Sequence, residues 1–326
     1  MLPPSSCQMM TLFIGVTGVC FMQGPVGDCM FCCPRGPDDV LYKLYTSSNP
    51  DTFQTLSPSD VGSLRASSFD PANPTVIYIF GYSEAATGRS TTTIKNAFMQ
   101  SGNFNFIVVD WSRLVAAPWY PSAVRNTRLM GQRLAQFVMF LEGSGVPAST
   151  LHVVGFSLGA EAAGFAGKAL RARGVTLGRI TGLDPAYPGY SLTNPSGHLS
   201  KGDAAFVDVV HTNPGLFGFP LPIGDVDFYP NHGQWIQPGC KINELLTDHQ
   251  LQYIYGCSHN RAWRLFAESV LNPRGFPATL CPDWKSGTSW CSFQVNGYMG
   301  YGANPTMVGK MYLETRSTAP FAKNGP

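Results

Sequence analysis

The stretch LHVVGFSLGAEAAGFAGKAL, residues 151–170, passes from a β-prone run into a run of small residues. The first run predicts a strand and the alanines after Gly159 predict a helix, which basic residues and Gly174 end. Ser157 stands between two glycines on the turn that joins them. Glycines tolerate a strained backbone and close packing, so the pattern predicts a nucleophile elbow. An ordinary glycine turn is the alternative, because a chain with 35 glycines readily contains G-x-S-x-G by chance.

The composition limits the kinds of function. The chain has 326 residues, of which 44% are hydrophobic and only 13% charged, and its formal net charge is +2. This length and apolar content suffice for one large core, and no repeat or low-complexity tract divides the chain. The small net charge gives no electrostatic footprint for nucleic acid, so we expect no nucleic-acid partner.

The amino-terminal region predicts export. Residues 9–22 are apolar but short for a bilayer span, which favours a signal peptide over residues 1–24 and a single domain over residues 25–326. A buried amino terminus is the alternative, because no basic residue precedes Arg35. Nine cysteines, several in short loops without zinc-ligand spacing, also favour a secreted protein. The partners of Cys29, Cys32 and Cys33 stay open.

Strand-like and helix-like segments alternate along the chain. Strands are predicted at residues 40–46, 75–82, 103–111, 151–156, 179–184 and 206–212. A helix is predicted between Ser122 and Gly143, where apolar residues recur with helical spacing. This alternation predicts an α/β fold with a mainly parallel sheet and helices on both faces. Reactive groups then gather beyond the carboxyl ends of the strands, where Ser157 is expected.

A nucleophilic serine needs a base and an acid that orients the base. In the α/β-hydrolase arrangement they follow it in the order Ser, Asp, His. Asp184 ends the next predicted strand, and Pro185 prevents that strand from continuing. We therefore assign Asp184 as the acid, with a loop-capping carboxylate as the alternative.

Six histidines compete for the role of base. His152 precedes Ser157 in the chain and lies at the wrong end of its strand, and the remaining weaker candidates are loop residues, namely His198, His232 and His249. His211 ends a strand and is the main rival. His259 follows Cys257 and is expected to open an apolar-faced helix, so a disulfide and a packed helix would hold its ring. We favour His259 on these grounds.

Acyl transfer also needs hydrogen-bond donors for the developing oxyanion. The amide of Leu158, directly after the serine, is the first donor expected. The amide of Tyr82 is the second, because Gly81 and Tyr82 follow a strongly β-prone strand and open a loop of small residues. The alternative is that Gly81 and Tyr82 merely end that strand.

Five motifs together resemble the pancreatic-lipase family, in chain order: VVGFSLGAEAAGFAGK, ITGLDPAYP, FVDVVHTNPG, DFYPNHGQWIQPGC and CSHNRAW. The resemblance runs from about Asp39 to the carboxyl terminus. It implies an α/β-hydrolase fold in which Ser157, Asp184 and His259 are nucleophile, acid and base. It also implies that Cys240 and Cys257 close a lid loop over residues 240–257, and we expect a second disulfide between Cys281 and Cys291.

Departures from the family pattern lead to further expectations. The oxyanion strand usually ends His-Gly-aromatic, whereas Phe80 stands here in place of the histidine. Where many relatives carry calcium-binding carboxylates, this chain has HLSKGDAA and retains Asp203, so we expect no structural metal and no other cofactor. The sequence ends at Pro326 without a β-sandwich resembling that of the digestive enzymes, so a colipase-type partner is not expected.

The resemblance implies a secreted hydrolase of acyl glycerolipids that acts at an aggregate or membrane surface. Triacylglycerol and phospholipid both remain open, although loops that look short resemble the phospholipase A1 branch. An amphipathic lid helix is expected from Ile242, Leu245, Leu246 and Tyr253, and interfacial contacts from Phe217, Phe219 and Leu221. The alternatives are a noncatalytic yolk-type storage protein on the same fold and a serine peptidase or thioesterase.

Overall fold

A computed structural model describes residues 10–12, 19–21, 34, 36–240, 251–281 and 294–323. Two short strands near the amino terminus, β1 (Met10–Leu12) and β2 (Val19–Phe21), pair with each other in antiparallel fashion. They fall within the expected signal peptide, which stays a prediction. Among the described residues, no helix combines the length and apolar character needed to cross a membrane.

The remaining strands form one large sheet in the order β12-β11-β13-β10-β9-β8-β7-β5-β6-β3-β4. Their bounds are β3 (Leu41–Tyr45), β4 (Gln54–Leu56), β5 (Thr75–Ile79), β6 (Asn105–Asp110), β7 (Leu151–Phe156), β8 (Arg179–Leu183), β9 (Phe206–Val210), β10 (Val226–Pro230), β11 (Pro277–Leu280), β12 (Gly297–Tyr298) and β13 (Gly309–Leu313). Neighbours from β6 through β13 in this order are parallel, and the outer pairs are antiparallel. The predicted α/β-hydrolase fold class, with a mainly parallel sheet, is confirmed.

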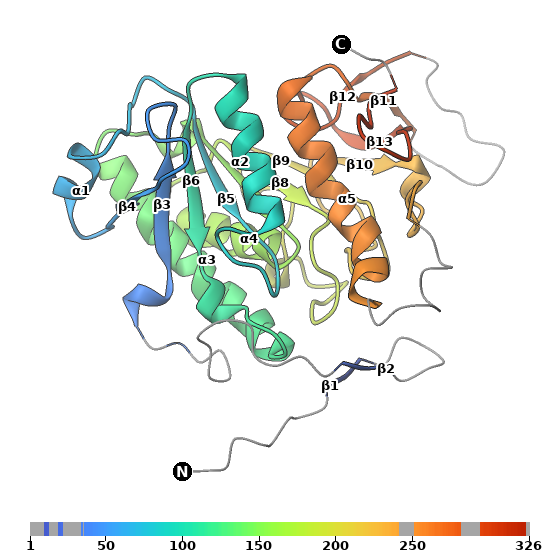
Figure 1. Cartoon of the computed structure of the whole chain (residues 1–326), viewed down its shortest axis with the longest axis horizontal. Helices are drawn as coiled ribbons and strands as arrows, with labels where there is room; N and C mark the ends of the chain where they lie inside the picture. The colour runs from blue at the N-terminus through green and yellow to red at the C-terminus, as the bar shows by residue number, and fades with distance from the viewer. Residues whose placement is uncertain are drawn as a thin grey trace.

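Helices cover both faces of this sheet. The longer ones are α2 (Arg89–Ser101), α3 (Tyr120–Gly143), α4 (Leu158–Arg171) and α5 (Leu251–Leu271), and α1 (Val61–Arg65) is short. Figure 1 shows α2 and α5 in front of the sheet and α4 behind it. The helices α3 and α4 pack closely, because a Cβ on Gly131 would lie 2.5 Å from that of Phe165. Every residue of β5, β7 and β9 is buried, as expected for parallel strands covered on both faces.

Two sequence expectations need correction. His259 does not open a helix, because α5 already begins at Leu251 and both Cys257 and His259 lie within it. The predicted strand at residues 75–82 ends at Ile79, so Gly81 and Tyr82 lie in the loop that follows. Both differences matter for the site, since they place His259 on a rigid helix and Tyr82 outside the strand ladder.

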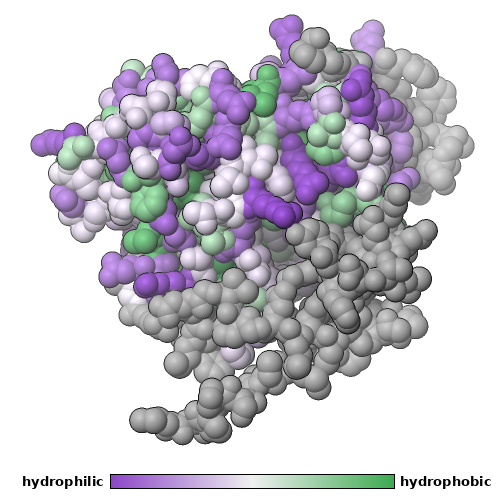
Figure 2. All heavy atoms as spheres, viewed as in Figure 1, coloured by the Kyte–Doolittle hydropathy of each residue, from purple (hydrophilic) through white to green (hydrophobic). Residues whose placement is uncertain are grey.

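The β6 arrow in Figure 1 points to the lower side of the view, where α5 begins. The carboxyl ends of the parallel strands therefore meet the first turns of α5 at that edge. On the broad face drawn in Figure 2, hydrophobic residues lie scattered among polar ones over the described elements. The candidate residues are therefore sought at the carboxyl ends of the strands.

Candidate active site

Ser157 occupies a strained turn between β7 and α4. Its backbone has φ 55° and ψ −120°, a conformation that non-glycine residues rarely adopt. The flanking glycines are required sterically, because a Cβ on Gly155 would lie 2.4 Å from the Gly159 oxygen and one on Gly159 would lie 2.1 Å from the Ile79 oxygen. The Ser157 amide donates to the Leu183 oxygen at 3.0 Å. This is the geometry of a nucleophile elbow, which lifts a serine above the sheet.

Asp184 follows directly on β8, the neighbouring strand, and is fully buried. Its Oδ1 accepts hydrogen bonds from the amides of Thr212 at 2.8 Å and Asn213 at 3.0 Å. Its Oδ2 lies 2.6 Å from Nδ1 of His259. A Cβ on Gly218 would stand 2.3 Å from Oδ1, so only glycine leaves room for the carboxylate there. Asp184 is therefore held on three sides and directed at one imidazole.

The His259 ring lies beside the residue that precedes the serine. Its centroid is 4.7 Å from the Phe156 ring and 5.7 Å from the Phe217 ring. Because Nδ1 faces Asp184, the Nδ1–H tautomer leaves Nε2 as the proton acceptor. Among the described contacts no hydrogen bond joins Ser157 Oγ to this ring, and such bonds are often long before substrate binds. The structure thus brings the three predicted residues to one edge of the sheet.

His211, the rival base, lies elsewhere and has both ring nitrogens engaged. Nε2 is 2.8 Å from Asp227 Oδ1, and Nδ1 is 3.1 Å from the Phe219 oxygen. The ring is fully buried and stacks on Tyr229 at 4.6 Å. Such a ring has no free nitrogen to offer a serine.

The other histidines also lie outside the site. His152 bonds Thr181 at 2.7 Å, and burial holds the pKa of its ring well below the usual value. His198 packs against Phe219 with its ring tilted by 37°, and His232 lies 3.7 Å from Glu314. His249 falls outside the described residues.

The two expected oxyanion donors flank Ser157. A Cβ on Gly81 would lie 3.0 Å from that of Ser157, so the loop carrying Tyr82 runs directly against the serine. The next amide, that of Ser83, donates to Val115 at 2.8 Å and fixes the loop. Within the described residues, neither the Tyr82 amide nor the Leu158 amide donates a hydrogen bond. An amide without an internal acceptor can donate to a developing negative charge, and the oxyanion assignment itself stays a prediction.

Cys240 and Cys257 form a disulfide. The segment between them that was expected to be a lid, including Ile242, Leu245 and Leu246, falls at residues 241–250 outside the described part. Tyr253 lies in the first turns of α5. Cys281 is disulfide-bonded, and its expected partner Cys291 is outside the described residues.

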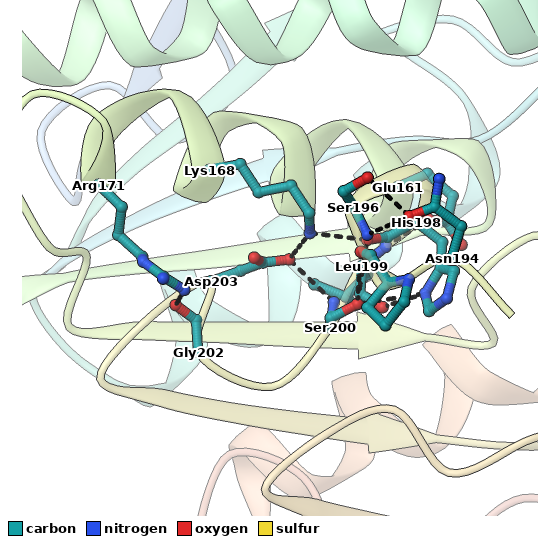
Figure 3. A network of polar contacts seen from close by, with 11 residues as sticks. Glu161, Lys168, Arg171, Asn194, Ser196, His198, Leu199, Ser200, Gly202 and Asp203 are labelled. Atoms are coloured by element: carbon teal, nitrogen blue, oxygen red, sulfur yellow. Dashed lines mark hydrogen bonds and ion pairs between the residues drawn. The ribbon is translucent and has the colours of Figure 1, made fainter.

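A second polar cluster on α4 was not predicted as a unit. The Lys168 ammonium donates to the Asp203 carboxylate and to the His198 oxygen, the latter at 2.7 Å (Figure 3). One turn after Ser157, the buried Glu161 accepts from the Leu199 amide at 2.7 Å. Asp203 thus meets a lysine, and no group of three or more metal-ligating residues occurs in the described ranges. A lone acid in an alanine-rich helix is the only sequence signal that pointed to Glu161.

Burial raises the pKa of Glu161 to about 8, although the Leu199 amide and Lys168 partly offset that effect. Oε1 of this carboxyl has no hydrogen-bond partner among the described residues. At neutral pH the group is therefore mostly a neutral acid.

Sequence comparison identifies the kind of protein to which this site belongs. A profile of the lipase family matches residues 35–321. The chain belongs to the lipase family. Among its lipase relatives, the inactive pancreatic lipase-related protein 1 of Mus musculus is 35% identical over 316 residues, which cover 89% of this chain and 66% of the relative. The resemblance drawn from the motifs is confirmed.

Pancreatic triacylglycerol lipases are similar to the same degree. Those of Oryctolagus cuniculus and Homo sapiens are each 34% identical to this chain. The matches cover 87% and 89% of this chain and 65% and 67% of the two lipases. The chain therefore spans about two thirds of the length of these relatives, and what the whole relatives do does not transfer automatically.

Proposed function

We propose that this lipase-family chain is a secreted carboxylic-ester hydrolase that cleaves acyl esters of glycerolipids. The observation that carries the proposal is the convergence of Ser157 on its strained turn with the Asp184–His259 pair. The arrangement matches a serine nucleophile, a base and a carboxylate that orients the base. The Cys240–Cys257 disulfide supports secretion, because disulfides persist in oxidising compartments.

In the proposed acylation step, Ser157 Oγ attacks the ester carbonyl carbon while His259 Nε2 takes the hydroxyl proton. The oxyanion accepts hydrogen bonds from the amides of Tyr82 and Leu158. The carbon–oxygen bond to the glycerol moiety then breaks, and the imidazolium returns its proton to the leaving oxygen. Asp184 stays ionised throughout and stabilises the imidazolium.

Deacylation reverses the roles with water. His259 takes a proton from water, and the resulting nucleophile attacks the acyl carbon. Collapse of the second tetrahedral intermediate releases the carboxylic acid and restores the Ser157 hydroxyl. No cofactor is needed for either step, since the residues of the chain supply every proton transfer.

Apolar side chains near the site support a lipid substrate. The Phe217 ring lies beside His259, and Leu221 and Trp235 are 43% and 51% exposed. Phe219, the third residue expected to contact the interface, is instead fully buried, so that expectation is wrong. The Trp235 segment is joined to the helix of His259, because the Gln237 amide donates to Ser258 Oγ at 2.9 Å. Exposed aromatic and aliphatic residues on segments joined to the candidate triad suit contact with acyl chains at an interface. Triacylglycerol and phospholipid both contain the required ester.

The proposal is tested with Ser157→Ala, assayed on a soluble short-chain ester, on triolein and on phosphatidylcholine vesicles. We expect turnover to fall to background on every substrate while the melting temperature stays near that of the wild type, because only the nucleophilic oxygen is lost. Equal turnover by both proteins would refute the enzyme proposal. Vesicle binding without turnover in either protein would favour the noncatalytic lipid-binding alternative.

A further inference from the structure

Asn213 lies behind Asp184, and every polar group of this nearly fully buried residue has a partner. Its backbone amide donates to Asp184 Oδ1 at 3.0 Å. Its side-chain Nδ2 donates to the Trp235 oxygen at 2.6 Å, and its Oδ1 accepts from the Phe217 amide at 2.9 Å. One residue therefore contacts the candidate acid and the two separate segments that carry Phe217 and Trp235.

The contacts of Asn213 connect the segments on both sides of the candidate acid. The backbone oxygen of Asn213 accepts from the Gly218 amide at 3.0 Å, and Gly218 is the residue whose missing Cβ leaves room for Asp184. On the other side, the Trp235 segment reaches Ser258, next to His259. A displacement of the Asn213 side chain would move the segments of Phe217 and Trp235, which lie on either side of the Asp184–His259 pair. Buried amides that satisfy several backbone groups at once fix such loops rigidly.

We propose that Asn213 is a positioning residue for the Asp184–His259 pair, acting by joining the Phe217 and Trp235 segments to the carboxylate. This inference rests on the proposed function, because it assigns a role within the same site. Asn213 touches neither substrate nor the reacting atoms. Its contribution is to keep the Asp184 carboxylate directed at His259 Nδ1 when an acyl chain binds against the Phe217 and Trp235 segments.

The first test compares Asn213→Ala with a matched control, Asn105→Ala. Asn105 is also fully buried and holds a loop, through bonds to the Asp70 oxygen at 2.7 Å and from the Asp70 amide at 3.0 Å, but it lies at the amino end of β6. On a soluble ester we expect kcat of Asn213→Ala to fall about tenfold to a hundredfold with little change in KM. Asn105→Ala should lose thermal stability but keep its kcat per folded molecule.

A second readout separates positioning from folding. Asn213→Ala adds no charge and keeps the backbone amide that donates to Asp184, so it changes only how firmly the carboxylate is held. A proton in a short Nδ1–H···O bond to a carboxylate gives a strongly downfield NMR signal, and we expect this signal of His259 to move upfield and broaden in Asn213→Ala. Asn105→Ala, which only lowers stability, should leave the signal in place.

The Nδ1 proton signal, recorded in the Ser157→Ala background, needs no turnover. It therefore tests Asn213 even if the proposed hydrolase function fails. Asp184 is the carboxylate in contact with this ring among the described residues, so the signal of Ser157→Ala without a second substitution is the reference. Equal kcat losses in Asn213→Ala and Asn105→Ala, or an Nδ1 proton signal unchanged in Asn213→Ala, would overturn the inference.

Discussion

Two imidazole–carboxylate pairs of this chain differ in what surrounds them. In His259–Asp184 the contact uses Nδ1 at 2.6 Å, whereas in His211–Asp227 it uses Nε2 at 2.8 Å. The His259 side chain keeps 13% of its surface exposed and lies beside Ser157's neighbour, while His211 is fully buried and its second nitrogen contacts the Phe219 oxygen. A histidine–aspartate pair thus becomes a candidate catalytic pair only where one ring nitrogen remains open to a reactant.

The largest expected effect comes from the His259–Asp184 pair. His259→Ala should lower turnover by about a thousandfold or more, because the serine then has no base. The melting temperature should also fall, because the variant leaves the buried Asp184 carboxylate without its imidazole, so turnover is expressed per folded molecule. Turnover on a soluble ester and thermal unfolding are measured on the same samples. A variant with near wild-type turnover would remove His259 from the mechanism.

The His211–Asp227 pair should respond in the opposite way where turnover is concerned. His211→Ala leaves the buried Asp227 carboxylate without its imidazole, and breaking such a pair costs about 3 kcal/mol of unfolding free energy. Turnover per folded molecule should stay close to that of the wild type, because His211 has no contact with Ser157 or Asp184 among the described residues. Urea denaturation with assays below the transition checks both parts. Strong loss of turnover in fully folded protein would contradict the comparison.

A third effect, on the pH dependence of stability and not on turnover, concerns Glu161, a buried carboxyl that has no imidazole partner. Its folded pKa, about 8, exceeds the ordinary value of 4.5, so the folded state binds this proton more tightly than the unfolded state. The group therefore makes the unfolding free energy fall as pH rises from about 4.5 to 8. Glu161→Gln removes this dependence, and its stability relative to the wild type should rise across that window.

Urea denaturation at pH 5, 6.5 and 8 measures the Glu161 effect. Glu142→Gln, at an exposed position on α3, is the matched control. Parallel pH profiles of wild type and Glu161→Gln would show that the carboxyl is not held neutral by the fold.

The central strands and the elbow could be predicted because their signals are local. The run ending at Phe156 is continuous and apolar, and the glycines on both sides of Ser157 mark positions where a side chain would clash with the backbone. Asp184 followed from chain order once the serine was placed. The residues alone favoured His259 over His211 without excluding the rival, because the decision depends on which ring nitrogen is engaged in each fold environment.

Other parts of the molecule gave weaker signals. The strand β10 was missed, since its buried Asp227 interrupts the apolar pattern and is satisfied by His211 and by the amides of Ile223 and Gly224. Asn213 looked like an ordinary turn residue because its partners at Asp184, Phe217 and Trp235 are brought together only by the fold. Side chains whose role depends on distant backbone groups leave no periodic trace in the sequence.

The large sheet ends, within the described residues, in two very short strands, β4 with three residues at one side and β12 with two at the other. A free strand edge is a template for pairing with a second molecule, and the number of unsatisfied backbone groups grows with its length. Under the proposed function, molecules gathered on a lipid surface meet one another at high local concentration. Short outer strands give them little backbone to pair, so edge-to-edge aggregation is disfavoured.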